Sequence, residues 1–297
     1  MLLIYPTIAY LLTLIMIVIH NRRMVADHDQ QEVQREITLT SKKHQLWIQL
    51  FILILLVLHG VACYQDIFTS EGIVFGFAQA LSLMAWVAIT LYWIEGWFFT
   101  LNGMLPLIIG LAMIFSFLPV VFSGAIISTK AVHSPGFKLH FITANIAYGI
   151  MFLAALQAIL MTMQDRSLRS KQQKDTSSWM GIFVFGRSSR LLEQLPPLLI
   201  MERVMFNIIG IGFCLLTIAV FSGIFFSQSL FGRPLIIDHK TIFALLSWAM
   251  FGGLLHAHWR VGLRGAEASK WVLGSFAVLV LAYIGSRFVL EVILHRL

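Results

Sequence analysis

Residues 46–64 read LWIQLFILILLVLHGVACY, an apolar stretch without a charged side chain. A transmembrane helix needs about 20 consecutive, mostly apolar residues. Stretches of this kind recur along the whole chain, at residues 2–20, 72–93, 101–122, 139–161, 204–226, 241–259 and 271–294. The sequence therefore predicts an all-α polytopic membrane protein, a bundle of eight transmembrane helices that forms a single domain over residues 1–297.

The composition leaves little room for a domain outside the bilayer. Of the 297 residues, 59% are hydrophobic and 12% are charged, whereas an average soluble domain has about 25% charged residues. The net charge is +7, but the positive residues lie in blocks between apolar stretches. Such blocks report membrane orientation, so the lipid bilayer is an expected partner and nucleic acid is not.

The links between the stretches differ in positive charge. Cytoplasmic links carry an excess of Lys and Arg. Most of the chain's Lys and Arg residues lie in the odd-numbered links: Arg22, Arg23, Arg35, Lys42 and Lys43 in the first, Arg166, Arg169, Lys171, Lys174, Arg187, Arg190 and Arg203 in the fifth, and Arg260, Arg264 and Lys270 in the seventh. This distribution predicts that both termini lie outside and that residues 162–203 form a cytoplasmic loop.

Motifs for catalysis and for covalent cofactors are missing from the sequence. The two cysteines, Cys63 and Cys214, form no CxxCH motif, so covalently attached heme is excluded. No HExxH, GxGxxG or GxxxxGK[ST] pattern occurs. We therefore predict no catalytic residues, and a binding role rather than an enzymatic one.

His59 lies inside the stretch quoted above, with apolar residues on both sides. An unpaired polar group in hydrocarbon costs several kcal/mol, so each ring nitrogen needs a partner. Two interpretations stay open. His59 either forms a hydrogen bond to Ser or Thr of a neighbouring helix, or it is a ligand of a metal or heme.

Among the other histidines in apolar stretches, His140 and His256 are further candidate ligands, whereas His258, nearer the membrane boundary, is expected to be interfacial. With about 1.5 Å of rise per residue, His59 lies roughly 7 Å, His140 roughly 2 Å and His256 roughly 22 Å below the outer surface. His59 and His140 are therefore the expected pair of axial ligands, and His256 is expected as a second, deeper contact.

Heme fits these residues better than a metal ion does. Two imidazoles without carboxylate or thiolate partners make a poor zinc site, whereas heme needs one or two axial nitrogens and an apolar slot. Arg287, near the outer end of the last stretch, is expected to receive a heme propionate. The alternative partner for Arg287 is Glu291, four residues later on the same helix.

Three segments resemble a known family: GIGFCLLTIAVFSGIFF (210–226) and IFALLSWAMFGGLLHAH (242–258) in the C-terminal third, and LHFITANIAYGIMF (139–152) further upstream. Their order is similar to that in the cytochrome c assembly family, heme-handling membrane proteins that include CcsA, ResC and CcmC. The segments PPLLIMERVMFNI, LLHAHWRVGLRG and LAYIGSRFV resemble its YpjD branch of eight-helix inner-membrane proteins. Of the family's Trp-Asp-Pro-Lys loop, this chain keeps only Asp238 and Lys240.

The resemblance implies a heme-binding protein of the bacterial inner membrane, related to cytochrome c maturation factors, with non-covalent heme b. It places His140 at the family's first external ligand and His256 at its intramembrane histidine. The alternative function is a cofactor-free membrane scaffold, or an accessory subunit of a divalent-cation transport system, with another membrane protein as its partner.

Overall fold

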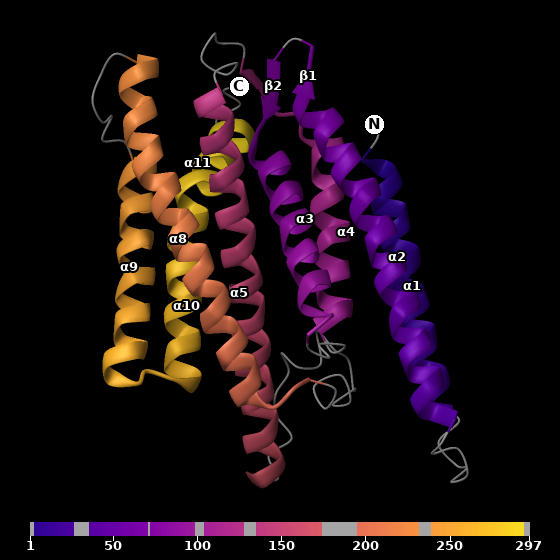
Figure 1. Ribbon diagram of the computed structural model, residues 1–297. Coiled ribbons are helices and arrows are strands. Elements are labelled where there is room, and N and C mark those ends of the chain that lie inside the picture. Colours follow the sequence, from indigo (N-terminus) through magenta and orange to yellow (C-terminus); the bar gives the residue numbers. More distant parts are fainter. Residues whose placement is uncertain are drawn as a thin grey trace.

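The computed structural model describes residues 3–26, 36–70, 72–98, 104–127, 135–173, 195–231 and 239–293. Asp238 and residues 174–194, half of the predicted loop 162–203, lie outside these residues. Long helices lie side by side in one bundle (Figure 1). They are α1 (Ile4–Ala26), α2 (Glu36–Ile67), α3 (Phe77–Glu95), α4 (Leu105–Val121), α5 (Pro135–Gln173), α8 (Leu198–Phe231), α9 (His239–Val261) and α10 (Gly265–Val280).

The last helix, residues 265–293, does not keep α-helical geometry to its end. After α10 the chain continues through a π-helical segment, η3 (Leu281–Gly285), a short α-helical piece, α11 (Ser286–Phe288), and a second π-helical segment, η4 (Val289–Ile293). Segments of π-helix are rare, and many lie at functional sites. The two segments flank Arg287, which the sequence placed in a regular helix.

The structure confirms a helical protein that crosses a membrane several times. Among the described residues, α2, α3, α5, α8 and α9 each contain a segment long and apolar enough to span a bilayer. Shorter apolar helices are Ile4–Ile19 and Leu105–Val121. Large apolar side chains such as Leu12, Trp47 and Val57 are exposed, as expected for a surface that faces lipid.

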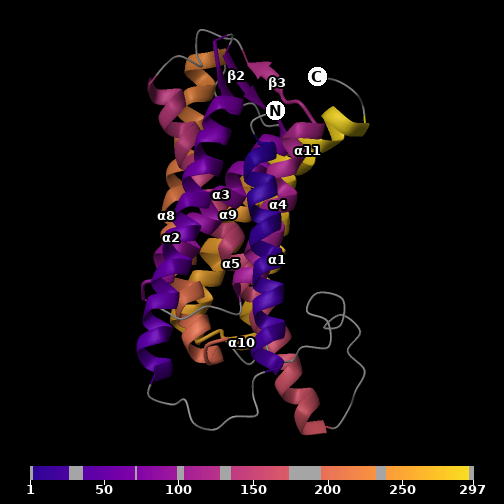
Figure 2. The same cartoon turned by 90° about the vertical axis from the view of Figure 1, so that its right-hand side faces the viewer.

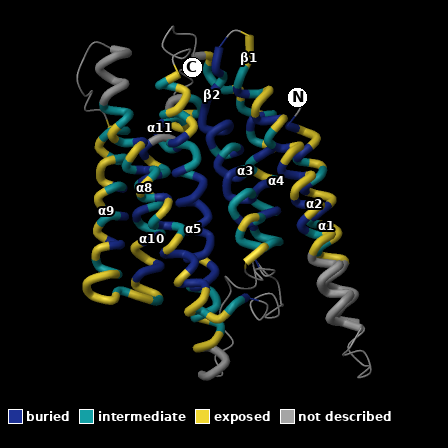
Figure 3. The backbone as a smooth tube through the Cα atoms, in the orientation of Figure 1, coloured by how far each residue is buried: buried dark blue, intermediate teal, exposed yellow. Residues whose placement is uncertain are grey.

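Helix α5 forms the centre of the bundle. It packs against α8, α3 and α10, and residues 149–158 are almost entirely buried (Figure 3). Helices α1 to α4 lie on one side of α5, while α8 to α10 lie on the other (Figure 1). Since α5 touches both groups, it is the element through which they hold together.

Several helices extend beyond the apolar stretches that predicted them. Helix α2 begins at Glu36, ten residues before the stretch 46–64, and α5 continues to Gln173. These extensions are rich in Lys, Arg, Gln and Glu, which have high helix propensity. Hydropathy therefore located the membrane-spanning segments, while the helix propensity of the polar residues beyond them determined where the helices end.

A small antiparallel sheet, which the all-α prediction did not include, covers one end of the bundle. Its strands β1 (Phe68–Thr69), β2 (Gly72–Phe75) and β3 (Ala125–Ile127) lie in the order β1-β2-β3. Residues 72–75 were expected to be the start of a helix; instead Gly72, with φ of 147°, turns the chain into a hairpin. We call this the sheet end of the bundle; α1 begins and η4 ends there (Figures 1 and 2).

Candidate functional site

A cavity of about 400 Å³ lies near the sheet end, between α5, α8, the start of α9 and the last helix. Pockets for small molecules and cofactors range over about 300–1,000 Å³. Its walls are mainly apolar and aromatic, and include Phe75, Phe137, Phe141, Leu216, Val220, Ile224, Leu245, Leu279 and Ile284. The cavity is therefore suited to a flat or elongated apolar ligand.

Polar side chains line the same cavity at a few positions. They are His140, Asn145, Tyr148, Lys240, Thr241 and Arg287. Two of these, Lys240 at the start of α9 and Arg287 in α11, are cations. An apolar ligand that also carries negative charge would match this combination of apolar walls and two positive groups.

His140 lies in the second turn of α5 and is oriented by α8. Its Nδ1 lies 2.8 Å from the Ser222 hydroxyl, and that hydroxyl donates to the carbonyl oxygen of Ala219 at 3.1 Å. Since a hydroxyl has one hydrogen, Ser222 accepts from the Nδ1–H of His140. The neutral ring then carries its lone pair on Nε2, the nitrogen that can ligate a metal.

Gly223 sets how closely α8 approaches this ring. A Cβ atom at that position would lie 3.2 Å from Cε1 and 3.9 Å from Nε2 of His140. A contact of 3.2 Å is tighter than ordinary van der Waals packing. The glycine therefore lets the imidazole lie directly against the backbone of α8.

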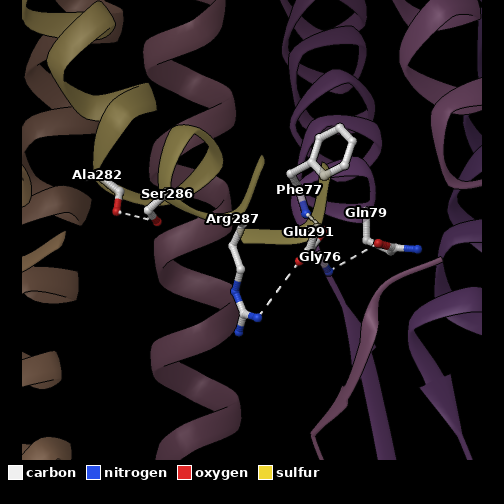
Figure 4. A network of polar contacts seen from close by, with 7 residues as sticks. All are labelled: Gly76, Phe77, Gln79, Ala282, Ser286, Arg287 and Glu291. Carbon is white, nitrogen blue, oxygen red and sulfur yellow. Dashed lines mark hydrogen bonds and ion pairs between the residues drawn. The ribbon is translucent and has the colours of Figure 1, made fainter. Parts of the chain in front are cut away.

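Arg287 has a second contact besides the cavity. One of its terminal nitrogens lies 3.8 Å from a carboxylate oxygen of Glu291, the alternative partner considered from the sequence (Figure 4). The other carboxylate oxygen accepts a hydrogen bond of 3.2 Å from the backbone N–H of Phe77, at the start of α3. Arg287 thus belongs both to the cavity wall and to an ion pair within the last helix, whose carboxylate bonds to the start of α3.

His59 lies apart from the cavity, in the interface of α1, α2 and α3. The ring is fully buried. Its Nδ1 forms a hydrogen bond of 2.9 Å with the Tyr10 hydroxyl, and its Nε2 one of 3.0 Å with the Ser82 hydroxyl. Both ring nitrogens thus form hydrogen bonds to neighbouring helices, as in the first of the two interpretations of His59. In this arrangement His59 has no lone pair to offer to iron and does not face His140.

His256 does not line the cavity either. Its side chain is exposed on α9. His258, expected at the membrane boundary, turns inward instead: its ring stacks on Phe206 at a centroid distance of 3.5 Å, and its Nδ1 lies 2.9 Å from the carbonyl oxygen of Leu263. Of the four residues predicted from the sequence, the structure brings together His140 and Arg287, and it brings neither His59 nor His256 to them.

Several residues of this site were not predicted as site residues, among them Lys240 and Ser222. Lys240 lines the cavity beside Arg287, and Ser222 orients His140. Lys240 carried a signal, because it is one of two residues kept from the family's loop. Ser222 carried none, since a serine in a membrane helix most often bonds to its own backbone.

Comparison with known proteins identifies the family of this chain. The family model of the cytochrome C assembly protein matches residues 47–294, most of the chain. The chain belongs to the cytochrome c assembly family. The match covers α5, α8, α9 and the last helix, which together form the cavity.

Three individual relatives match part of the chain, at 28% to 32% identity. The chain is 28% identical over 188 residues to the inner membrane protein YpjD of Escherichia coli K12, which is 59% of this chain and 65% of YpjD. It is 32% identical over 156 residues to a 28.8 kDa protein of Azospirillum brasilense, 52% of either chain. It is 32% identical over 93 residues to the cytochrome c biogenesis protein CcsA of Trichodesmium erythraeum, 31% of this chain and 26% of CcsA.

The first two of these matches thus span about half to two thirds of the relatives' own length. No solved structure matches the chain.

Proposed function

We propose that this protein binds heme b non-covalently in the cavity at the sheet end and serves heme handling in cytochrome c assembly. The observation that carries the proposal is a histidine, with its Nε2 lone pair set by Ser222, in one apolar cavity with two cations. Heme requires this combination: an axial nitrogen for iron, apolar walls for the porphyrin, and positive groups for its propionates.

In the proposed complex each group has one role. Nε2 of His140 would hold the heme iron, and the Nδ1–H donated to Ser222 keeps the ring in orientation, as hydrogen-bond partners of metal-binding histidines do. Lys240 and Arg287 receive propionates. The aromatic walls, among them Phe137 and Phe141, exclude water from the porphyrin faces. Bound heme would supply redox and ligand-exchange chemistry to the assembly pathway.

The proposal includes a topology. All eight apolar stretches cross the bacterial inner membrane, both termini lie outside, and residues 162–203 form the cytoplasmic loop. The positive charge of the odd-numbered links supports this arrangement, as does the position of the start of α1 and the end of η4 at one end of the bundle. The heme cavity then opens near the outer surface, the side on which c-type cytochromes are assembled.

Heme content of the detergent-purified protein tests the proposal. Protein expressed with ample heme should show a Soret band, and His140→Ala should lower the heme-to-protein ratio by at least tenfold, because the axial ligand is lost. His256→Ala is the matched control, since it removes an exposed histidine outside the cavity, and it should keep the wild-type ratio.

A protein without a Soret band, or an unchanged ratio in His140→Ala, contradicts heme binding at this cavity. The scaffold or accessory-subunit function, with another membrane protein as partner, would then be favoured. A deletion strain that keeps its cytochrome c content but becomes sensitive to divalent cations would support that alternative.

A further inference from the structure

Glu291 places a carboxylate in a helix that we propose to cross the membrane. Ionisable side chains in such helices are costly and rarely lack a function. The side chain of Glu291 is only 5% exposed. Its two oxygens face the backbone N–H of Phe77, at 3.2 Å, and the guanidinium of Arg287, at 3.8 Å (Figure 4). The carboxylate is therefore held from two sides.

The absence of a side chain at Gly76 leaves space for this carboxylate. Gly76 precedes α3, and a Cβ atom there would lie 2.6 Å and 2.9 Å from the two oxygens of Glu291. The backbone of Gly76, with φ of −140°, is extended and open to any residue, so the constraint is one of space. Glu291 also lies at the positive end of the α3 dipole, which favours an anion.

The same carboxylate is coupled to the heme cavity. Arg287 and Lys240 both line that cavity, and both act electrostatically on Glu291. In a medium of low dielectric constant, charges a few ångströms apart interact far more strongly than in water. A ligand carboxylate that approaches these two cations therefore meets the negative charge of Glu291 as well.

We propose that Glu291 is an internal counter-ion that sets the affinity of the cavity for ligands with carboxylate groups. It partly neutralises Arg287 and Lys240, and it competes with the propionates of a porphyrin for them. This inference rests on the proposed function, whose ligand it describes further. Glu291 itself contacts no ligand; it is a specificity-determining residue that acts through the two cations.

Substitution of Glu291 by Gln isolates the charge. Gln keeps an oxygen that can accept from the N–H of Phe77 and nearly the same shape, but it removes the anion. Glu291→Gln should bind protoporphyrin IX roughly five- to tenfold more tightly than the wild type, the size of one charge interaction in a partly buried site. Protoporphyrin IX dimethyl ester, whose carboxylates are blocked, should bind both proteins equally.

The measurement is a fluorescence titration of detergent-purified protein with each porphyrin, with protein-free micelles as the blank. Glu202→Gln is the matched control, because Glu202 pairs with Arg264 at 3.9 Å, away from the cavity. This variant should bind both porphyrins as the wild type does. In the Arg287→Gln background, the gain from Glu291→Gln should shrink.

Metal-free porphyrin has no iron for His140 to ligate, so this experiment and the heme-content experiment can fail separately. The same affinity of Glu291→Gln and wild type for protoporphyrin IX overturns the inference. An equal change for the dicarboxylate and the dimethyl ester overturns it as well. Protein that contains no heme after expression with ample heme, but still binds added protoporphyrin IX, overturns iron ligation by His140 and leaves the role of Glu291 standing.

Discussion

At the scale of single residues, His59 in α2 shows that the side chains around a buried histidine determine its role. His59 connects three helices, because it bonds to Tyr10 of α1 and to Ser82 of α3. The Ser82 hydroxyl also lies 3.5 Å from the thiol of Cys63. A buried polar network whose members are all satisfied rigidifies the packing around it. His59 therefore holds α1 and α3 against α2.

We expect His59→Ala to destabilise the protein without removing heme. The substitution removes the partner of the buried Tyr10 hydroxyl, leaves Ser82 with only the Cys63 thiol, and opens a cavity, which should cost about 2–4 kcal/mol in the free energy of unfolding. Thermal unfolding in detergent measures the loss, and the heme-to-protein ratio of the folded fraction should stay at the wild-type value. A ratio that falls while the unfolding temperature is unchanged would restore His59 as an iron ligand.

At the scale of elements, the contact between α3 and α5 depends on one small residue. A Cβ atom at Gly149 of α5 would overlap with the Cβ atom of Val87 in α3. Helix interfaces in membranes are rich in small residues, because these let two backbones approach closely. This contact joins α5 to the helices on its α1–α4 side and so supports the wall from which His140 projects.

Gly149→Ala should therefore destabilise the bundle, by about 1–3 kcal/mol, the range for overpacking a filled core. Gly210→Ala in α8 is the matched control, because a Cβ there meets nothing within 4 Å. It should be neutral or stabilising by up to about 1 kcal/mol, since Ala favours a helix over Gly. The comparison is made by thermal unfolding in detergent, and equal midpoints for the two variants would contradict the close contact.

At the scale of the whole molecule, charge and chain direction together support one orientation in the membrane. The odd-numbered links hold most of the Lys and Arg residues, and the described chain begins and ends at the sheet end (Figure 2). The positive-inside rule then places the sheet end, and with it the cavity, outside the cytoplasm.

Reporter fusions test this orientation. Alkaline phosphatase, which is active only outside the cytoplasm, should be active when fused after Leu297. Green fluorescent protein, which folds in the cytoplasm, should fluoresce when inserted after Lys174 in the fifth link, and a second insertion after Gly262, between α9 and α10, serves as the control for another odd-numbered link. The reverse pattern of activities would invert the molecule and move the cavity to the cytoplasmic side.

The sequence alone determined the membrane class, the positions of the apolar helices and the family. These follow from local composition, because the free energy of burying a segment in lipid depends on that segment's own side chains. Helix ends were less predictable, as α2 and α5 show, since propensity carries a helix past its apolar part. The strand at residues 72–75 needed its partners in β1 and β3 to form.

Only the tertiary structure decided which polar side chains meet. Depth along a helix could be counted from the sequence, but rotation about the helix axis and the choice of neighbour depend on how all helices pack. His59 and His140 were close in depth, yet one faces α1 and α3 while the other faces α8. Lys240 at the start of α9 and Arg287 in α11 line one cavity for the same reason: how their helices pack beside it is a property of the whole bundle.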